Sequence, residues 1–184
     1  MQHLGTRPIQ TPRLSLRRFR RSDAGPMFRR WAGVAEATRY LTWNTHQSRR
    51  ETAGVIRRWL AAYDDQPGFY EWAITLSPGG KLIGSIGAAA QPGGEPACEI
   101  GYCIAPEYWN RGFATEACQA VIQYLWGCGF ESIDALHDLR NPASGRVMQK
   151  CGMTCRGQRM VLMAKNGQRI PCLHYEIRKE GEPD

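Results

Sequence analysis

A turn-like segment, Trp109-Asn110-Arg111-Gly112-Phe113-Ala114, has the residue types that point most directly to chemistry. It lies between a predicted strand and a predicted amphipathic helix. The first turn of a helix leaves backbone N–H groups unpaired and carries a partial positive charge, so a pyrophosphate can bind there without dedicated side chains. Gly112 and Ala114 add little bulk along the approach. The segment therefore predicts a site for a ligand that carries a pyrophosphate.

Two other phosphate-binding motifs are absent from the sequence. Neither the G-x-x-x-x-G-K-[ST] loop of NTPases nor the G-x-G-x-x-G dinucleotide fingerprint occurs. A plain structural turn is the alternative interpretation of residues 109–114.

The elements that must position this turn are predicted from hydrophobic periodicity and turn chemistry. Apolar residues alternate with period two in the expected strands, and a period near 3.6 marks the helix that follows Gly112. Ser48 and Glu51 have capping-box spacing at a helix start. Expected strands cover 14–19, 70–76, 81–89, 97–104, 132–137, 154–161 and 172–178. Expected helices begin near Ser22-Asp23, Ser48, Gly112 and Pro142, and expected turns cover 77–80 and 91–96. This order predicts an α/β fold with a mixed sheet and helices on its faces.

The composition is that of a folded globular protein. The chain has 184 residues, of which 42% are hydrophobic and 22% charged, and we expect a single domain covering 1–184. No run approaches the roughly 18 apolar residues that span a bilayer, and the N-terminal segment lacks the apolar core of a secretory signal. A cytoplasmic location without a membrane partner is therefore expected.

The net charge of +7 comes largely from arginine pairs spread along the chain. Because no aromatic platform lies between them, they favour a solvated surface over a nucleic-acid groove, although the charge would attract a phosphorylated cofactor. The seven cysteines lack the paired C-x-x-C spacing of a zinc site. We therefore predict a metal-free protein with buried, reduced thiols.

Residues 109–114 resemble the cofactor motif Q/R-x-x-G-x-G/A of the GNAT acetyltransferases. Trp109 departs from the usual first residue, and with Thr115-Glu116-Ala117 it resembles the RimJ/RimL branch of ribosomal-protein N-terminal acetyltransferases. Segments 11–17, 99–102, 141–144 and 147–153 extend the resemblance along the chain. The resemblance implies the GNAT fold, a mostly antiparallel sheet that is splayed between its fourth and fifth strands, with helices on both faces. It implies acetyl-CoA as cofactor, bound by Tyr102, Cys103, Ile104, Trp109, Asn110, Arg111, Gly112, Phe113, Ala114, Thr115, Asn141 and Ser144.

Acetyl transfer from a thioester to an amine requires a neutral amine, a stabilised oxyanion and a proton for the departing thiolate. The resemblance points to backbone N–H groups at residues 102–104 for the oxyanion. Many members use a tyrosine as the acid at the place of Met148, whose side chain cannot donate a proton. The N-x-x-S pattern of the Rim-type branch implies Ser144 as the group that hydrogen bonds the sulfur, with a bond to its own backbone as the alternative. Asn141 can cap the same helix or bind the cofactor's amide groups.

Glu99 is the candidate base that draws a proton from the amine through water. Strand parity places it with Gly101 and Cys103, opposite the apolar residues of the same strand. A solvated or salt-bridged carboxylate is the alternative. Cys103 is disfavoured as a nucleophile because spacing suggests no His-Asp pair near it. His137 and His174 receive no role.

The expected function is an acetyl-CoA-dependent N-acetyltransferase in which a primary amine attacks directly. A peptide N-terminus, with a pKa near 7.7 to 8.0, is partly neutral at cytosolic pH, whereas a lysine amine is far less so. The sequence leaves open whether the acceptor is a peptide N-terminus or a small molecule, and whether a C-terminal edge strand pairs two copies into a homodimer. A non-catalytic acyl-CoA-binding or ribosome- and RNA-associated module is the competing hypothesis.

Overall fold

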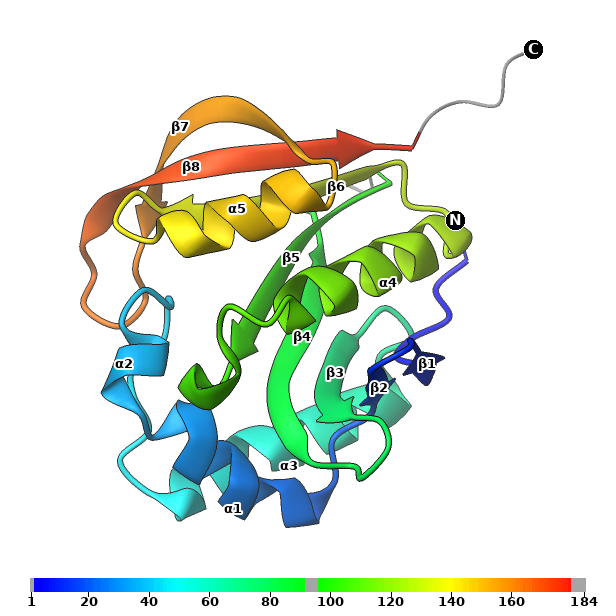
Figure 1. Ribbon diagram of the computed structural model, residues 1–184, viewed down its shortest axis with the longest axis vertical. Coiled ribbons are helices and arrows are strands. Elements are labelled where there is room, and N and C mark those ends of the chain that lie inside the picture. Colours follow the sequence, from blue (N-terminus) through cyan, green and yellow to red (C-terminus); the bar gives the residue numbers. More distant parts are fainter. Residues whose placement is uncertain (1, 92–95, 180–184) are drawn as a thin grey trace.

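An eight-stranded sheet forms the centre of the computed structural model, which describes residues 2–91 and 96–179 (Figure 1). The strands lie in the order β1-β2-β3-β4-β5-β6-β8-β7. Neighbouring strands are antiparallel except β5 and β6, which are parallel. The strands are β1 (Ile9–Gln10), β2 (Leu14–Arg17), β3 (Tyr70–Leu76), β4 (Leu82–Ala90), β5 (Ala97–Ile104), β6 (Ser132–Asp138), β7 (Thr154–Leu162) and β8 (Arg169–Arg178). The predicted mixed, mostly antiparallel sheet is confirmed.

Helices cover both faces of the sheet. α4 and α5 pack on one face, against β5 and β6, while α1 and α3 enclose a cavity against the other (Figure 1). The helices are α1 (Ala24–Met27), α2 (Ala35–Thr38), α3 (Arg49–Asp65), α4 (Phe113–Gly127) and α5 (Pro142–Lys150). Shorter 3-10 or π-helical turns cover Arg21–Asp23, Phe28–Ala32 and Pro106–Tyr108. The predicted helices on both faces are confirmed.

β5 and β6 separate from each other after their first residues. Their parallel pairing covers Ala97–Glu99 of β5 and 132–134 of β6. On its other side β5 stays paired with β4 as far as Ile104. Counted from β2, which was the first strand expected from the sequence, these are the fourth and fifth strands. The predicted opening between them is therefore confirmed.

Two predicted strand ends are wrong for local reasons. The first predicted strand ends at Arg17 and not near Phe19, because the backbone N–H of Phe19 donates to Tyr63 Oη rather than to a neighbouring strand. β8 begins at Arg169 and not at Cys172, because its first residues extend the hairpin with β7. The other predicted strands and helices differ from the structure only in their terminal residues.

The start of α3 has most of the predicted capping box. Ser48 Oγ accepts the backbone N–H of Glu51 at 3.1 Å. The Glu51 carboxylate accepts the N–H of Gln47 at 2.7 Å, one residue before the partner that a capping box would use. Of the two predicted turns, residues 77–79 form one, and the other falls largely on residues 92–95, which lie outside the described residues.

The apolar stripe predicted for α4 packs into the core. Its buried residues are Ala117, Cys118, Val121, Ile122 and Leu125. Ala114, the first residue of the stripe, is only partly buried because it lines a cavity at the start of the helix. One face of α4 thus holds the helix against the sheet while its first turn stays accessible.

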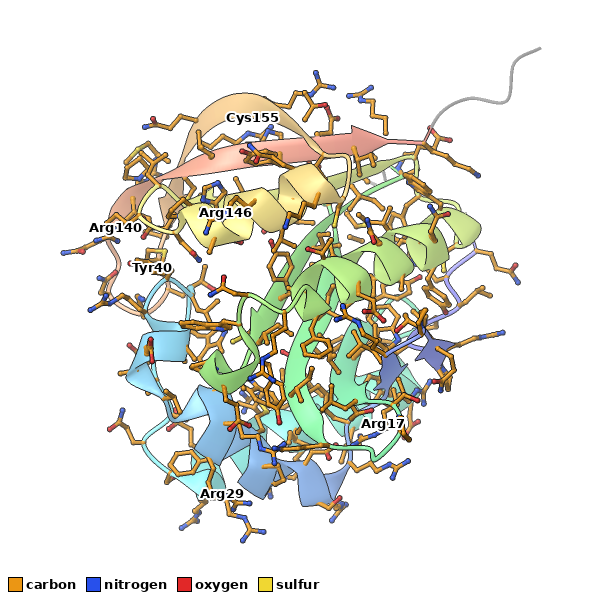
Figure 2. All side chains as sticks on the ribbon, viewed as in Figure 1. Arg17, Arg29, Tyr40, Arg140, Arg146 and Cys155 are labelled. Carbon is orange, nitrogen blue, oxygen red and sulfur yellow. The ribbon has the colours of Figure 1, made fainter. Side chains whose placement is uncertain are left out.

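All seven cysteines are free thiols, and most are buried. The prediction of buried thiols is wrong for Cys155, which is exposed on the outer strand β7 (Figure 2). Within residues 2–91 and 96–179 no group of three or more His, Cys, Asp or Glu side chains is placed to hold a metal ion. None of the helices in that part of the chain is long and apolar enough to cross a membrane.

Candidate active site

The chain enters α4 through two residues with left-handed backbone, Asn110 (φ 58°) and Gly112 (φ 78°). Glycine adopts this conformation without a steric penalty, and asparagine tolerates it better than most residues. Gly112 is the N-cap of α4, and no side-chain cap bonds to the helix start. The N–H groups of residues 113–115 therefore have no intrahelical partner and are available to an anion.

Two residues that precede β2 hold this turn in place. The Glu116 carboxylate accepts from Thr11 Oγ1 at 2.7 Å, from the Arg13 backbone N–H at 2.9 Å and from Arg13 Nε at 2.6 Å. Arg13 also donates to the Arg111 carbonyl at 3.0 Å. Burial raises the pKa of Glu116, but the bonds from Thr11 and Arg13 outweigh it and the net shift is downward, which keeps the carboxylate charged. Sequence analysis did not find this role of Thr11 and Arg13, since they lie about a hundred residues from the turn.

Trp109 ties the same turn to the end of β5. Its indole Nε1 donates to the Ile104 carbonyl at 2.7 Å, while 39% of the residue remains exposed. Trp109, which departs from the usual motif, therefore makes a structural hydrogen bond through its indole N–H. A glutamine or arginine at this position has no indole and would not make the same bond.

A groove of about 450 Å³ runs from the start of α4 to the opening between β5 and β6. It brings together all but one of the predicted cofactor residues: Tyr102, Cys103, Ile104, Trp109, Asn110, Gly112, Phe113, Ala114, Thr115, Asn141 and Ser144. Arg111 is the exception. Its guanidinium lies 5.6 Å from the centre of the Tyr108 ring, outside the groove lining.

Two walls of the groove were not predicted from the sequence. α2 and the residues after it contribute Glu36, Ala37, Tyr40 and Leu41, and α5 contributes the basic residues Arg146 and Lys150. Tyr40 lies between α2 and α5, and Arg146 projects from α5 (Figure 2). The spacing of Arg146 and Lys150 was a signal in the sequence, because residues four apart lie on the same face of a helix.

Ser144 is hydrogen bonded to β5. The Tyr102 hydroxyl donates to the Ser144 carbonyl at 2.9 Å and lies 3.0 Å from Ser144 Oγ. The side-chain bond is thus to Tyr102 and not to the helix backbone, which was the alternative considered for Ser144. The contact links β5 to α5, and both residues line the groove.

Asn141 and Met148 lie on either side of Ser144 in the chain, and of these two only Asn141 lines the groove. Asn141 is the N-cap of α5, but its side chain makes no capping bond, so its amide is free to contact a ligand. Met148, one turn beyond Ser144, is 1% exposed and supplies only a thioether. His137 Nε2 is buried beside Gly145 without a hydrogen-bond partner among the described residues.

A second cavity, of about 1240 Å³, lies on the opposite face of β5. Glu99, Gly101 and Cys103 line it, together with Ile100 and Tyr102. Along β5, Glu99 and Gly101 are exposed whereas Ile100 and Ile104 are buried, which agrees with the predicted strand parity. The cavity shares part of its lining with the first groove, including Tyr102, Cys103 and Ser144. The two spaces therefore meet where β5 and β6 separate.

Glu99 retains contact with solvent in this cavity. Desolvation raises its pKa, the nearby Asp134 carboxylate raises it further, and His174 and Arg159 oppose the shift. Asp134 is itself hydrogen bonded to His174 and, at 2.9 Å, to Gln91 Nε2. Glu99 thus lies near other charged groups and solvent, which fits the alternative of a solvated carboxylate. It also faces the cavity, which a base would have to do.

Burial raises the pKa of the Cys103 thiol to about 12. A thiol with such a pKa is almost entirely protonated at neutral pH, and only the thiolate is a strong nucleophile. This agrees with the expectation that Cys103 does not accept the acyl group.

Residues 13–154 match the model of the acetyltransferase (GNAT) domain family. The chain belongs to the GNAT acetyltransferase family. It is 32% identical over 175 residues to the uncharacterized N-acetyltransferase YoaA of Bacillus subtilis (strain 168), covering 95% of this chain and 98% of that protein. A shorter stretch, 47% of this chain and 52% of the relative, is 34% identical to the uncharacterized N-acetyltransferase YnaD of the same organism. The protein is therefore an acetyltransferase enzyme.

Solved GNAT structures share the fold. A GNAT acetyltransferase from Bacillus anthracis superposes with a TM-score of 0.79 at 23% identity, covering 94% of this chain and 98% of that one. RimL, an α-N-acetyltransferase of ribosomal protein L7/L12 solved with coenzyme A, superposes with a TM-score of 0.77 at 18% identity, covering 94% and 98% of the two chains. At these identities the likeness establishes the GNAT fold and not a shared substrate.

Proposed function

We propose that this GNAT enzyme takes the acetyl group of acetyl-CoA and transfers it to a primary amine by direct attack. The observation that carries the proposal is the meeting of two cavities between β5 and β6, with Tyr102, Cys103 and Ser144 lining both. A thioester held from the α4 side and an amine entering from the α3 side would come together there. Relatives named as N-acetyltransferases support the choice of nitrogen as the acceptor.

The cofactor fits residues that are already in place. The unpaired N–H groups at the start of α4 would hold its pyrophosphate, and the Arg146 and Lys150 side chains lie on the same groove to hold phosphate charge. Acetyl-CoA would supply the activated acetyl group as a thioester. Two superposing structures contain this ligand class, RimL with coenzyme A and the microcin C7 self-immunity acetyltransferase MccE with acetyl-CoA and AMP.

The chain supplies groups for each proton that must move. Glu99 would take, through water, the proton that an ammonium group loses before attack. As the C–N bond forms and the C–S bond breaks, Ser144 would donate its hydroxyl proton to the sulfur and recover one from the nitrogen. Backbone N–H groups on the open edge of β5 at residues 102–104 would stabilise negative charge on the carbonyl oxygen, an effect worth about 3 kcal/mol per donor.

We also infer that the protein belongs to the RimJ/RimL-type branch. Trp109 at the start of the cofactor turn and Asn141 with Ser144 at the start of α5 support this assignment, because all three line one groove. The acceptor is then the α-amine of a peptide or the amine of a small molecule.

Acetyl-CoA consumption with a panel of primary amines tests the function. The panel contains short peptides with free N-termini, arylalkyl amines and polyamines, and mass spectrometry detects the acetylated product. Turnover with any of them supports the enzyme. Tight acetyl-CoA binding without turnover across the panel, together with salt-dependent RNA binding, would favour the competing binding module instead.

A further inference from the structure

The cavity on the α3 side of the sheet offers both apolar and charged surface. Trp43, Trp59 and Phe69 line it and are each partly exposed. Aromatic side chains of this kind bind the carbon body of a small ligand, while a few polar groups fix its orientation. A charged group on the sheet floor of such a cavity therefore favours a ligand of opposite charge.

Glu71 of β3 is such a group, and it has no role in the function proposed above. It lies opposite Gly87 of β4, which in turn lies opposite Gly101 of β5. All three residues line the cavity. Glu71, Gly87 and Gly101 thus form a row across β3, β4 and β5, and β5 is the strand expected to hold the thioester.

The two glycines leave this row open. A side chain at Gly87 would collide with Glu71 Oε2, so the carboxylate lies over the Gly87 backbone. A Cβ at Gly101 would meet nothing within 4 Å. Since neighbouring strands are about 4.8 Å apart, the carboxylate lies about one strand spacing from open space above β5. A group bound to Glu71 would therefore lie beside the opening between β5 and β6.

The carboxyl group of Glu71 has no cationic partner in the part of the chain that the structure describes. Among residues 2–91 and 96–179, no lysine, arginine or histidine forms a salt bridge with it. Ser85 of β4 donates to its carboxyl group, and the neutral Cys103 thiol of β5 lies near it. Tyr63 of α3 donates to the backbone carbonyl of Glu71 at 2.6 Å, and Arg58 lines the same cavity without forming a salt bridge with Glu71. Burial raises the pKa of Glu71 to about 8, and the hydrogen bond with Ser85 opposes the shift only in part. Three other acidic residues line the cavity: Asp138, which is bonded to Arg140 at 2.6 Å, Glu51, which accepts the backbone N–H of Gln47 at the start of α3, and Glu99, which has the base role proposed above.

We propose, resting on the N-acetyltransferase function above, that Glu71 binds the ammonium group of the acceptor, and that the acceptor is a small primary amine with an apolar, aromatic-sized body. The carboxylate would pair with the ammonium, and Trp43, Trp59 and Phe69 would contact the body. Glu71 is then a binding and specificity residue, distinct from the proton-accepting role assigned to Glu99.

A peptide N-terminus fits this site less well. Each peptide unit carries an N–H and a C=O, and burying these against aromatic side chains without partners costs free energy. A small amine has one polar group, which the Glu71 carboxylate satisfies. The site therefore selects between the two acceptor classes that the sequence left open.

Calorimetry on the complex with coenzyme A tests the role of Glu71 without any acetyl transfer. The probes are 2-phenylethylamine, protonated at pH 7, and 2-phenylethanol, in which a neutral hydroxyl replaces the ammonium group. We expect the amine to bind more tightly than the alcohol by about 10- to 100-fold, the scale of a charged hydrogen bond in a desolvated site. With a pKa of about 8, the Glu71 carboxyl group is largely protonated at pH 7 in the free protein. The bound ammonium group should lower this pKa below 7, so binding of the amine should release a proton. Titrations in two buffers with different ionisation enthalpies measure that proton.

Glu71→Gln is the decisive variant, and Glu131→Gln, an exposed glutamate in the turn before β6, is the matched control. In Glu71→Gln we expect amine and alcohol to bind equally, proton release to vanish and coenzyme A affinity to stay unchanged, whereas the control should match the parent.

A parent that does not prefer the amine, or a variant that keeps the preference, would overturn the assignment of Glu71. A peptide with a free N-terminus that binds more tightly than 2-phenylethylamine would overturn the small-amine class. If the amine binds through Glu71 but acetyl-CoA is never consumed, the proposed function fails while the binding site stands.

Discussion

The Tyr102 hydroxyl on β5 lies 3.0 Å from Ser144 Oγ on the first turn of α5, where β5 and β6 have separated. The same hydroxyl donates to the Ser144 carbonyl at 2.9 Å. Because both residues line the groove and the second cavity, the pair fixes a hydroxyl group at the place where thioester and amine would meet. Met148, the position that carries a tyrosine in many family members, is buried and cannot perform that function.

Ser144→Ala should lower kcat by about 10²-fold or more, on the scale of losing a general acid, and raise the KM for acetyl-CoA much less. Steady-state kinetics with the best amine of the panel measure both constants. Tyr102→Phe, which keeps the ring and removes only the orienting hydroxyl, should lower kcat by a smaller factor. Full kcat in Ser144→Ala would return this serine to a purely structural role at the start of α5.

Gly112→Asp should abolish acetyl-CoA binding. It adds bulk at a backbone φ of 78° that favours glycine, and it places negative charge beside the N–H groups proposed to hold the pyrophosphate. Isothermal titration with acetyl-CoA measures the effect. Gly127→Asp, the same change at the exposed far end of α4, is the control and should keep parental affinity. Unchanged affinity in Gly112→Asp would remove the cofactor site proposed at this turn.

Glu99→Gln should reduce kcat by about 10²-fold at neutral pH and leave acetyl-CoA affinity nearly unchanged. A base acts as the carboxylate, so the parental rate should fall as pH drops through the pKa of Glu99, which desolvation places above its usual 4.5. The difference between parent and variant should shrink at high pH, where the acceptor is already neutral. Rate profiles across pH check this. A variant equally impaired at every pH would assign Glu99 to positioning within the Asp134–His174 cluster.

Glu176 of β8 should contribute to stability in a pH-dependent way. Bonds from Arg178, Ser132 and Arg156 hold its pKa at about 2, below the usual 4.5, although Arg156 and Arg178 are well exposed. A lowered pKa stabilises the folded state above about pH 4.5, and that stability is lost as pH falls toward 2. Glu176→Gln should lower the free energy of unfolding at pH 7 by about 1 kcal/mol, allowing for solvent screening. Denaturant unfolding should show the difference vanishing near pH 2, and a difference that persists there would exclude a charge effect.

Local features of the fold were predictable because they are encoded in short segments. The alternation along β3 and β5, the stripe on α4 and the turn at Gly112 depend only on residues a few positions apart. Strand parity alone placed Glu99 on the same side as Gly101 and Cys103. The same local patterns, with the family resemblance, were enough to predict the GNAT fold and the location of the cofactor turn.

Contacts between distant segments were decided only by the tertiary structure. Three such contacts are Arg13 with Glu116, Tyr102 with Ser144, and Glu71 over Gly87. They depend on how strands and helices pack and not on any period in the sequence. The order β6-β8-β7 at one edge of the sheet, which exposes Cys155, is likewise a matter of strand pairing. Sequence alone therefore determined the period of most strands and helices, and it predicts a pyrophosphate ligand at the turn before α4. The packing of the sheet decided which side chains meet in the two cavities, because burial and charge compensation exist only once elements far apart in the chain are in contact.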